Sequence, residues 1–169
     1  MSAETTAQPA APARAARRTR TGLLVWVAVL AGVDLAIKAL AETLLATGAT
    51  VELGVMNIRL LHNTGVAFSL GSGLPVWVVI TATGLIITAL VWHALKTAPA
   101  MTGLSLTGAA LLIGGAIGNF IDRLDGRGVV DYLHTGWFAT FNLADAFVTV
   151  GVGLYILGTL ITTRPPPQP

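Results

Sequence analysis

The chain of 169 residues contains no cysteine. This absence excludes disulfide bonds, a thiolate nucleophile and any metal site with cysteine ligands. Charged residues are also scarce, because they make up 11% of the sequence, against about 25% in an average soluble domain. Hydrophobic residues account for 54%. This composition excludes an ordinary soluble globule and a disordered chain, and ten basic residues in so apolar a sequence form no continuous basic surface for nucleic acid.

Four long apolar segments dominate the sequence. Each has the roughly 20 residues that are needed to cross about 30 Å of hydrocarbon. Spans of this kind must be helical, because lipid offers no hydrogen-bond partners to an open backbone. We therefore predict an all-α membrane protein, a single four-helix domain of residues 21–163, with helices at about Leu23–Leu45, Leu74–Leu95, Thr102–Ile121 and Phe141–Thr162.

The two ends of the chain differ in composition from the spans. Residues 1–20 are rich in Ala, Pro, Thr and Arg, and we predict a disordered basic tail. Residues 164–169 are mostly proline, which cannot continue a helix. A basic segment before an apolar one also fits a cleaved signal peptide. Asp34 and Lys38 interrupt the first span, and this favours a retained membrane anchor.

The distribution of charge predicts the orientation. Four spans place both termini on one side of the membrane, where six of the ten basic residues and one of the eight acids fall. Cytoplasmic loops carry an excess of Lys and Arg. We therefore expect both termini in the cytoplasm. The basic residues of this side are Arg14, Arg17, Arg18, Arg20, Lys96 and Arg164.

The segment of residues 47–73 joins the first two spans. It shows a partial alternation of apolar and polar residues and is punctuated by glycine. This pattern indicates short strands. We predict a small antiparallel β-sheet outside the membrane, between the first and second helices.

Ionisable residues gather at the opposite end of the spans from the termini. Asp34 and Lys38 lie four residues apart, on one face of the first helix. Asp122 and Arg123 follow the third span, and Asp145 lies one turn into the fourth. An ionisable group inside a membrane span is energetically costly, so it indicates a functional site.

Short motifs recur at these positions and together resemble the lipoprotein signal peptidases, the type II signal peptidases of bacteria. The resemblance covers residues 22–162, and the motifs stand in the family's order. They are Asp34 with Lys38, Asn63-Thr-Gly-Val-Ala-Phe68, Gly118-Asn-Phe-Ile-Asp-Arg123, Val129-Val-Asp-Tyr132 and Phe141-Asn-Leu-Ala-Asp145.

The resemblance implies an intramembrane aspartyl endopeptidase. Such an enzyme removes signal peptides from diacylglyceryl-modified prolipoproteins, on the amino side of the lipidated cysteine. The family's two catalytic aspartates map onto Asp131 and Asp145, and Asp122 takes a supporting role. Tyr132 and Leu35 stand where many relatives have Phe and Gln. Neither difference removes an ionisable group.

The chemistry of paired carboxylates agrees with this implication. Two carboxylates that lie close together cannot both ionise cheaply, so one keeps a proton. The ionised member activates water, and the protonated member stabilises the carbonyl oxygen and then protonates the leaving amine. No metal or other cofactor is needed. We expect lipid-modified prolipoproteins and membrane lipids as partners, no nucleic acid, and a monomeric enzyme.

Other residues near the spans have both a functional and a structural interpretation. Asp34 with Lys38 fits a structural ion pair beneath the site, and Asp122 with Arg123 fits an ion pair at a helix end. Asp145 itself also fits a structural acid paired with Lys38 or Arg123. The spacing of Gly114 and Gly118 favours close helix packing. Three amide side chains suit either hydrogen bonding to substrate and dyad or helix capping and turns, namely Asn63, Asn119 and Asn142.

Three other classes of protein remain to be compared. A small proton-coupled transporter would use an intramembrane acid such as Asp34, but would leave the other acids without a role. A serine hydrolase would need Ser69 or Ser72 beside a base, for which His62, His134 and Lys38 are the candidates, and the sequence has no Gly-x-Ser-x-Gly. The two histidines lack the HExxH spacing of zinc peptidases. A membrane scaffold would need neither pair of acids.

Overall fold

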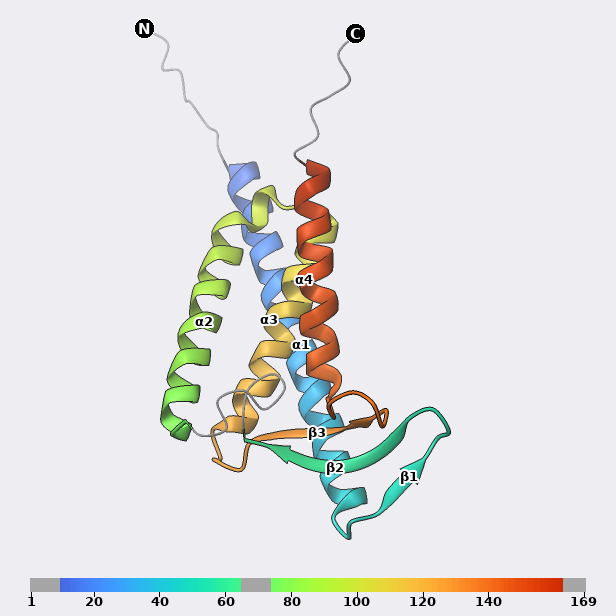
Figure 1. Cartoon of the computed structure of the whole chain (residues 1–169). Coiled ribbons are helices and arrows are strands. Elements are labelled where there is room, and N and C mark those ends of the chain that lie inside the picture. Colours follow the sequence, from blue (N-terminus) through green and yellow to red (C-terminus); the bar gives the residue numbers. More distant parts are fainter. Residues whose placement is uncertain (1–9, 65–73, 163–169) are drawn as a thin grey trace, which may run out of the picture.

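The computed structural model describes residues 10–64 and 74–162, and it contains four long helices and a three-stranded sheet (Figure 1). A short 3-10 helix, η2, connects α2 to α3. The elements in chain order are α1 (Ala10–Leu45), β1 (Thr50–Glu52), β2 (Asn57–Asn63), α2 (Val76–Thr97), η2 (Ala98–Ala100), α3 (Gly103–Arg123), β3 (Val129–His134) and α4 (Leu143–Thr162).

The four helices confirm the predicted spans. Each is long and apolar enough to cross a membrane, and the bounds of α2, α3 and α4 differ from the predicted ones by one or two residues. α1 begins at Ala10, so the prediction of a disordered tail over residues 1–20 is wrong for residues 10–20. Alanine and arginine are strong helix formers, and proline is tolerated in the first turn, where Pro12 lies. Residues 1–9 and 163–169 lie outside the described part.

Glycine lets the helices approach closely. A Cβ atom added at Gly115 would lie 2.5 Å from the carbonyl oxygen of Ala144 in α4, and one added at Gly151 would lie 2.5 Å from the backbone nitrogen of Leu112 in α3. The first glycine of the Gly-xxx-Gly motif, Gly114, faces α1 in the same way. The predicted packing role of this motif is therefore confirmed at Gly114.

The sheet has the order β1-β2-β3, with both pairs antiparallel. β1 and β2 form the hairpin that was predicted between the first two helices. β3 comes from the connection between α3 and α4, and this third strand was not predicted. Residues 65–73 of the predicted segment lie outside the described residues.

The sheet lies at one end of the helical bundle, and the first turn of α1 and the last turn of α4 lie at the other end (Figure 1). The last turns of α1 pack against β3 through a cluster of buried residues, Ala41, Leu45, Val130 and Tyr132. This packing fixes β3 against the bundle, close to the first turn of α4.

Candidate active site

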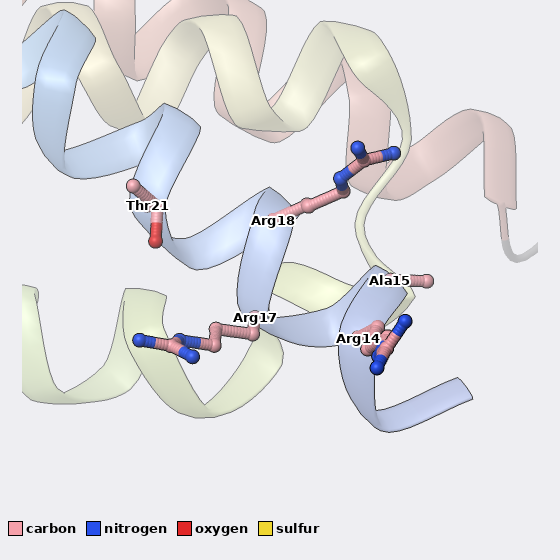
Figure 2. Close-up of a pocket in the computed structure, with 5 residues that line it drawn as sticks. All are labelled: Arg14, Ala15, Arg17, Arg18 and Thr21. Carbon is pink, nitrogen blue, oxygen red and sulfur yellow. The ribbon is translucent and has the colours of Figure 1, made fainter. Parts of the chain in front are cut away.

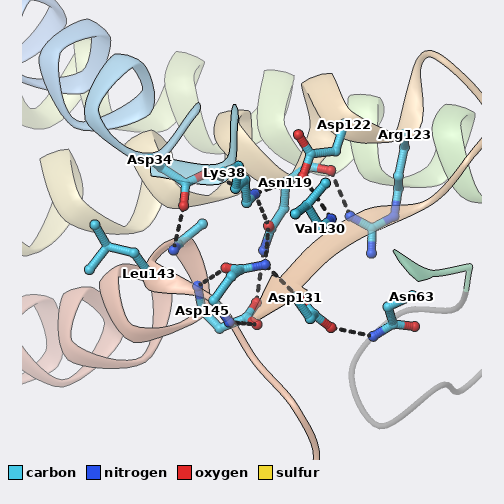
Figure 3. A network of polar contacts seen from close by, with 12 residues as sticks. Asp34, Lys38, Asn63, Asn119, Asp122, Arg123, Val130, Asp131, Leu143 and Asp145 are labelled. Carbon is cyan, nitrogen blue, oxygen red and sulfur yellow. Dashed lines mark hydrogen bonds and ion pairs between the residues drawn. The ribbon is translucent and has the colours of Figure 1, made fainter. Parts of the chain in front are cut away.

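Asp131 and Asp145 reach the same cavity from different elements. Asp131 lies on β3, where its residue is 1% exposed, and Asp145 is the third residue of α4. Both line a cavity of about 530 Å³ at the sheet end of the bundle. The structure therefore brings together the two aspartates that were predicted as a catalytic pair (Figure 3).

Asn142 connects the two carboxylates and is fully buried. Its Nδ2 donates to Oδ1 of Asp131 at 2.7 Å and also lies 3.0 Å from Oδ1 of Asn119. Asn119 Nδ2 donates to Oδ1 of Asp145 at 2.8 Å. Asn63 Nδ2 donates to Oδ2 of Asp131 at 3.1 Å. Amide donors thus hold both aspartates in place, which is one of the two roles that the sequence left open for these three asparagines.

The first turn of α4 is capped by the same residues. Oδ1 of Asn142 accepts a hydrogen bond from the backbone N–H of Asp145 at 3.0 Å, and Oδ2 of Asp145 accepts one from the backbone N–H of Asn142 at 3.2 Å. This reciprocal arrangement is a capping box. Asn142 therefore serves both functions that the sequence left open, because it caps the helix and contacts the dyad.

Two further acceptors complete the cap. Oδ1 of Asp34 accepts from the backbone N–H of Ala144 at 2.9 Å, and the Tyr132 hydroxyl oxygen accepts from that of Leu143 at 3.2 Å. Burial raises the pKa of Tyr132 to about 12, so its hydroxyl stays protonated at neutral pH. No local sequence pattern predicts this role of Tyr132, because its partner is a backbone group eleven residues away.

Lys38 lies beneath the dyad and binds three groups. Its Nζ is 2.8 Å from Oδ2 of Asp34, 2.8 Å from Oδ2 of Asp122 and 2.8 Å from Oδ1 of Asn119. The Lys38 side chain is 3% exposed. The predicted Asp34–Lys38 ion pair is confirmed, and it is part of a larger network that joins α1 to α3.

The prediction of an ion pair between Asp122 and Arg123 is wrong. Asp122 pairs with Lys38 and also accepts from the backbone N–H of Val130 at 3.1 Å, next to Asp131. Arg123 Nη1 donates to the carbonyl oxygen of Asn119 at 2.8 Å. Consecutive residues point to different sides of a helix, and this geometry separates the two side chains.

Asp145 forms no ion pair with Lys38 or Arg123, the two bases that the sequence suggested as its partners. Arg123 lines the cavity together with both aspartates, so a guanidinium group faces the space beside the dyad. Asp145 receives its hydrogen bonds from Asn119 and Asn142. The structural interpretation of Asp145 as the ion-pair partner of a base is not what the structure shows.

Gly118 packs directly against the carboxylate of Asp34. A Cβ atom at this position would overlap Oδ2 of Asp34. The second glycine of the Gly-xxx-Gly motif therefore makes room for a side chain that caps α4, and its role is to admit this polar contact as well as to bring the helices close.

Burial and the negative charge of Asp145 raise the pKa of Asp131 to about 6, against the lowering effect of the amides of Asn63 and Asn142. The ordinary value is 3.8. Because the folded protein binds this proton more tightly than the unfolded chain, the contribution of Asp131 to stability falls as pH rises from about 4 to about 6.

We expect Asp131→Asn to remove this pH dependence. The variant has no titrating group at the position, so the melting temperature of the wild type relative to that of the variant should decrease between pH 4 and pH 6 and then level off. Thermal unfolding in detergent at a series of pH values measures the difference. A constant or increasing difference over this range would contradict the raised pKa.

The alternative catalytic groups are engaged elsewhere or lie outside the described residues. His62 Nε2 lies 3.2 Å from Oε1 of Glu42, and His134 Nδ1 lies 3.2 Å from Oγ1 of Thr140. Ser69 and Ser72 fall in the undescribed segment. Within residues 10–64 and 74–162, no group of three His, Asp or Glu side chains is arranged to hold a metal ion.

Comparison with known proteins identifies the family. The sequence model described as signal peptidase (SPase) II matches residues 26–161. The chain belongs to the signal peptidase II family. A lipoprotein signal peptidase of Sinorhizobium fredii is 38% identical over 147 residues, which cover 84% of this chain and 87% of the relative. One from Brucella ovis is 41% identical over 146 residues, which cover 83% and 89%.

Solved structures are similar in fold to this member of the signal peptidase II family. Two, both described as bacterial membrane enzymes, are similar to this chain with TM-scores of 0.76 and 0.71 and with 28% and 27% identity. The first comparison covers 88% of this chain and 94% of the other, and the second covers 85% and 95%. The protein is thus a multi-pass membrane peptidase of a bacterial family, and the transporter and scaffold interpretations are set aside.

Proposed function

We propose that this signal peptidase is an aspartyl endopeptidase, with Asp131 and Asp145 as its catalytic residues, and that it releases signal peptides from diacylglyceryl-modified prolipoproteins. The observation that carries the proposal is the pair of carboxylates, on β3 and α4, that line one cavity and are both bound by Asn142. The side-chain Nδ2 of Asn142 donates to Asp131, and its backbone N–H donates to Asp145. The relatives named lipoprotein signal peptidase, which are 38% and 41% identical to this chain, support the proposed substrate class.

The charge around the dyad supports a shared proton. Four carboxylates, those of Asp34, Asp122, Asp131 and Asp145, lie with two cations, Lys38 and Arg123. Burying an unpaired charge is costly. A proton on the dyad reduces this excess, and the raised pKa of Asp131 favours its place on that residue in the resting enzyme.

The reaction follows from these positions. Ionised Asp145 takes a proton from a water molecule, whose oxygen attacks the scissile carbonyl carbon, while protonated Asp131 donates a hydrogen bond to the carbonyl oxygen. Asp131 then passes its proton to the leaving amine as the C–N bond breaks, and the proton that Asp145 took from water becomes the single proton that the dyad retains. The carboxylates are kept in orientation throughout the reaction by Asn63, Asn119 and Asn142. No covalent intermediate forms.

The supporting residues set the position of the dyad. Asp122 holds the backbone beside Asp131, and Asp34 holds the first turn of α4. Lys38 balances the charge of both. Gly118 leaves the space that Asp34 occupies, and Arg123 faces the substrate cavity, where it is suited to bind a peptide carbonyl.

Cleavage of a synthetic lipidated prolipoprotein peptide by the purified enzyme tests the proposed function. We expect turnover of the diacylglyceryl peptide and at least tenfold less of the same peptide without its lipid. Because the chain has no cysteine, activity should survive thiol reagents, and it should also survive serine reagents and EDTA. Loss of turnover in EDTA, followed by recovery with zinc, would exclude the aspartyl mechanism.

We also propose that both termini lie in the cytoplasm of the bacterial inner membrane and that the dyad lies near the outer face. The excess of basic residues at the end of the bundle with the termini supports this orientation. Cysteines introduced at Thr5 and Gln168 should resist an impermeant maleimide in intact cells and react after lysis. The natural absence of cysteine makes the wild type the blank, and labelling of both positions in intact cells would reverse the orientation.

A further inference from the structure

The first turns of α1 carry a cluster of positive charge, and no acidic residue of ranges 10–64 and 74–162 lies near it. Arg14, Arg17, Arg18 and Arg20 are all exposed there. The acidic residues of the described part all lie toward the sheet end, from Asp34 onward. Arginines three and four residues apart on a helix repel one another. The cluster therefore favours binding of an anion, which the described residues at this end of the protein do not supply.

One of the four arginines has a partner, and three surround an open hollow. Arg20 Nε donates to the carbonyl oxygen of Leu95 at 2.8 Å. Arg14, Arg17 and Arg18 line a hollow of about 880 Å³ with Thr21. Figure 2 shows that Arg17 and Arg18 leave α1 on different sides, so the guanidinium groups spread around the helix.

An apolar groove of about 620 Å³ lies between α1 and α3. Its walls include Thr19, Gly22 and Trp26 from α1, and Gly103 and Leu111 from α3. A Cβ atom added at Gly22 or at Gly103 would meet no atom within 4 Å. These two glycines therefore keep the groove open at the end nearest the arginines.

The two hollows are adjacent on one helix. Arg18 and Gly22 are four residues apart, which places them on the same face of α1 and about 6 Å apart along its axis. A cationic site one helical turn from an apolar groove matches a molecule with an anionic head and a hydrocarbon tail. A small anion would leave the groove unused, and an uncharged lipid would leave the arginines unneutralised.

We propose that this is a binding site for one acidic phospholipid, from the leaflet at the end of the bundle that carries the termini. Its phosphate contacts Arg18 and Arg14, which share one face of α1 with Gly22, and one acyl chain lies in the groove against Gly22 and Trp26. Basic residues near a membrane surface attract anionic lipid by about fivefold in affinity for each residue. The site is remote from the dyad, and the proposal does not depend on peptidase activity.

Quenching of Trp26 fluorescence by lipids with brominated acyl chains tests the proposal. The full-length protein should carry Trp77→Phe, Trp92→Phe and Trp137→Phe, so that Trp26 is the remaining tryptophan. In bilayers of phosphatidylcholine, brominated phosphatidylglycerol should quench Trp26 at several-fold lower mole fraction than brominated phosphatidylcholine. Glycerol 3-phosphate, the head group without chains, should not displace the lipid at millimolar concentration.

Matched variants separate the groove from the charge. Gly22→Leu places a side chain in the groove, where an added Cβ meets no atom within 4 Å. Gly32→Leu is its control, because Gly32 lies on the same helix with no atom near its Cβ position and does not line the groove. Arg18→Gln removes one charge from the hollow, and Lys96→Gln removes one from the exposed end of α2.

We expect Gly22→Leu to abolish the preference for phosphatidylglycerol and Arg18→Gln to weaken it roughly fivefold, with no change in either control. Equal quenching by the two lipids would overturn the proposal. An unchanged preference in Gly22→Leu, equal losses in Arg18→Gln and Lys96→Gln, or displacement by glycerol 3-phosphate would also overturn it, because each would indicate unspecific charge attraction without a seated acyl chain.

Discussion

Asp131→Asn and Asp145→Asn are each expected to lower the initial cleavage rate by at least 10²–10⁴, the usual contribution of one general acid or base. Both variants keep the shape of the side chain but cannot exchange a proton. The two carboxylates act as a unit, so the double variant should be little slower than either single one. The rate on a lipidated substrate, normalised to folded enzyme in detergent, is the measurement.

The stability of the variants distinguishes a loss of catalysis from a loss of folded enzyme. Every oxygen of the two carboxylates accepts an amide hydrogen bond, so an asparagine turns one amino group toward a donor and should cost about 1–3 kcal/mol. Asp122→Asn is the control, because Asp122 supports β3 and pairs with Lys38. It should lose stability together with activity. Near-normal turnover by Asp131→Asn, with none in folded Asp122→Asn, would assign the second catalytic role to Asp122.

Lys38→Met is expected to cause the largest loss of stability. It leaves the carboxylates of Asp34 and Asp122 without their cation, and breaking a buried ion pair by removing one partner typically costs about 3–5 kcal/mol. The melting temperature in detergent measures the effect. Lys96→Met, at an exposed position of α2, is the matched control and should change stability by less than about 1 kcal/mol.

A second substitution tests the cause of that loss. Asp34→Asn in the Lys38→Met background removes one unpaired charge, so part of the lost stability should return. Equal melting temperatures for Lys38→Met and Lys96→Met would show that the buried network contributes little. A further decrease in the double variant would show that the cap of α4 by Asp34 matters more than its charge.

The sequence predicted the parts of this fold that depend on local pattern. Long apolar runs gave four helices with nearly correct bounds, and the spacing of four between Asp34 and Lys38 gave the ion pair. β3 left no such pattern, because its first four residues are all buried and show no alternation of polar and apolar positions. Its pairing with β2 joins residues about seventy positions apart, and such contacts are not visible in a local window.

The sequence predicted which residues form the site better than it predicted which partners these residues bind. Composition suggested disorder before residue 20, although alanine and arginine favour the helix that forms from Ala10. Adjacency in sequence suggested that Asp122 pairs with Arg123, whereas helix geometry directs Asp122 to Lys38. The dual role of Asn142 depends on β3 and α4 meeting in space, and the sequence does not specify that meeting locally.

The connection between β3 and α4 is closed at its base by a pair of backbone hydrogen bonds. Leu133 and Phe141 exchange backbone hydrogen bonds of 2.8 and 3.0 Å. These bonds close the segment of residues 134–140, and Asp131 precedes it in the chain while Asp145 follows it. Phe138, Ala139 and Thr140 from this loop line the cavity. We therefore expect substitutions at Phe138, Ala139 and Thr140 to change which substrates enter the cavity, while the two aspartates keep their places.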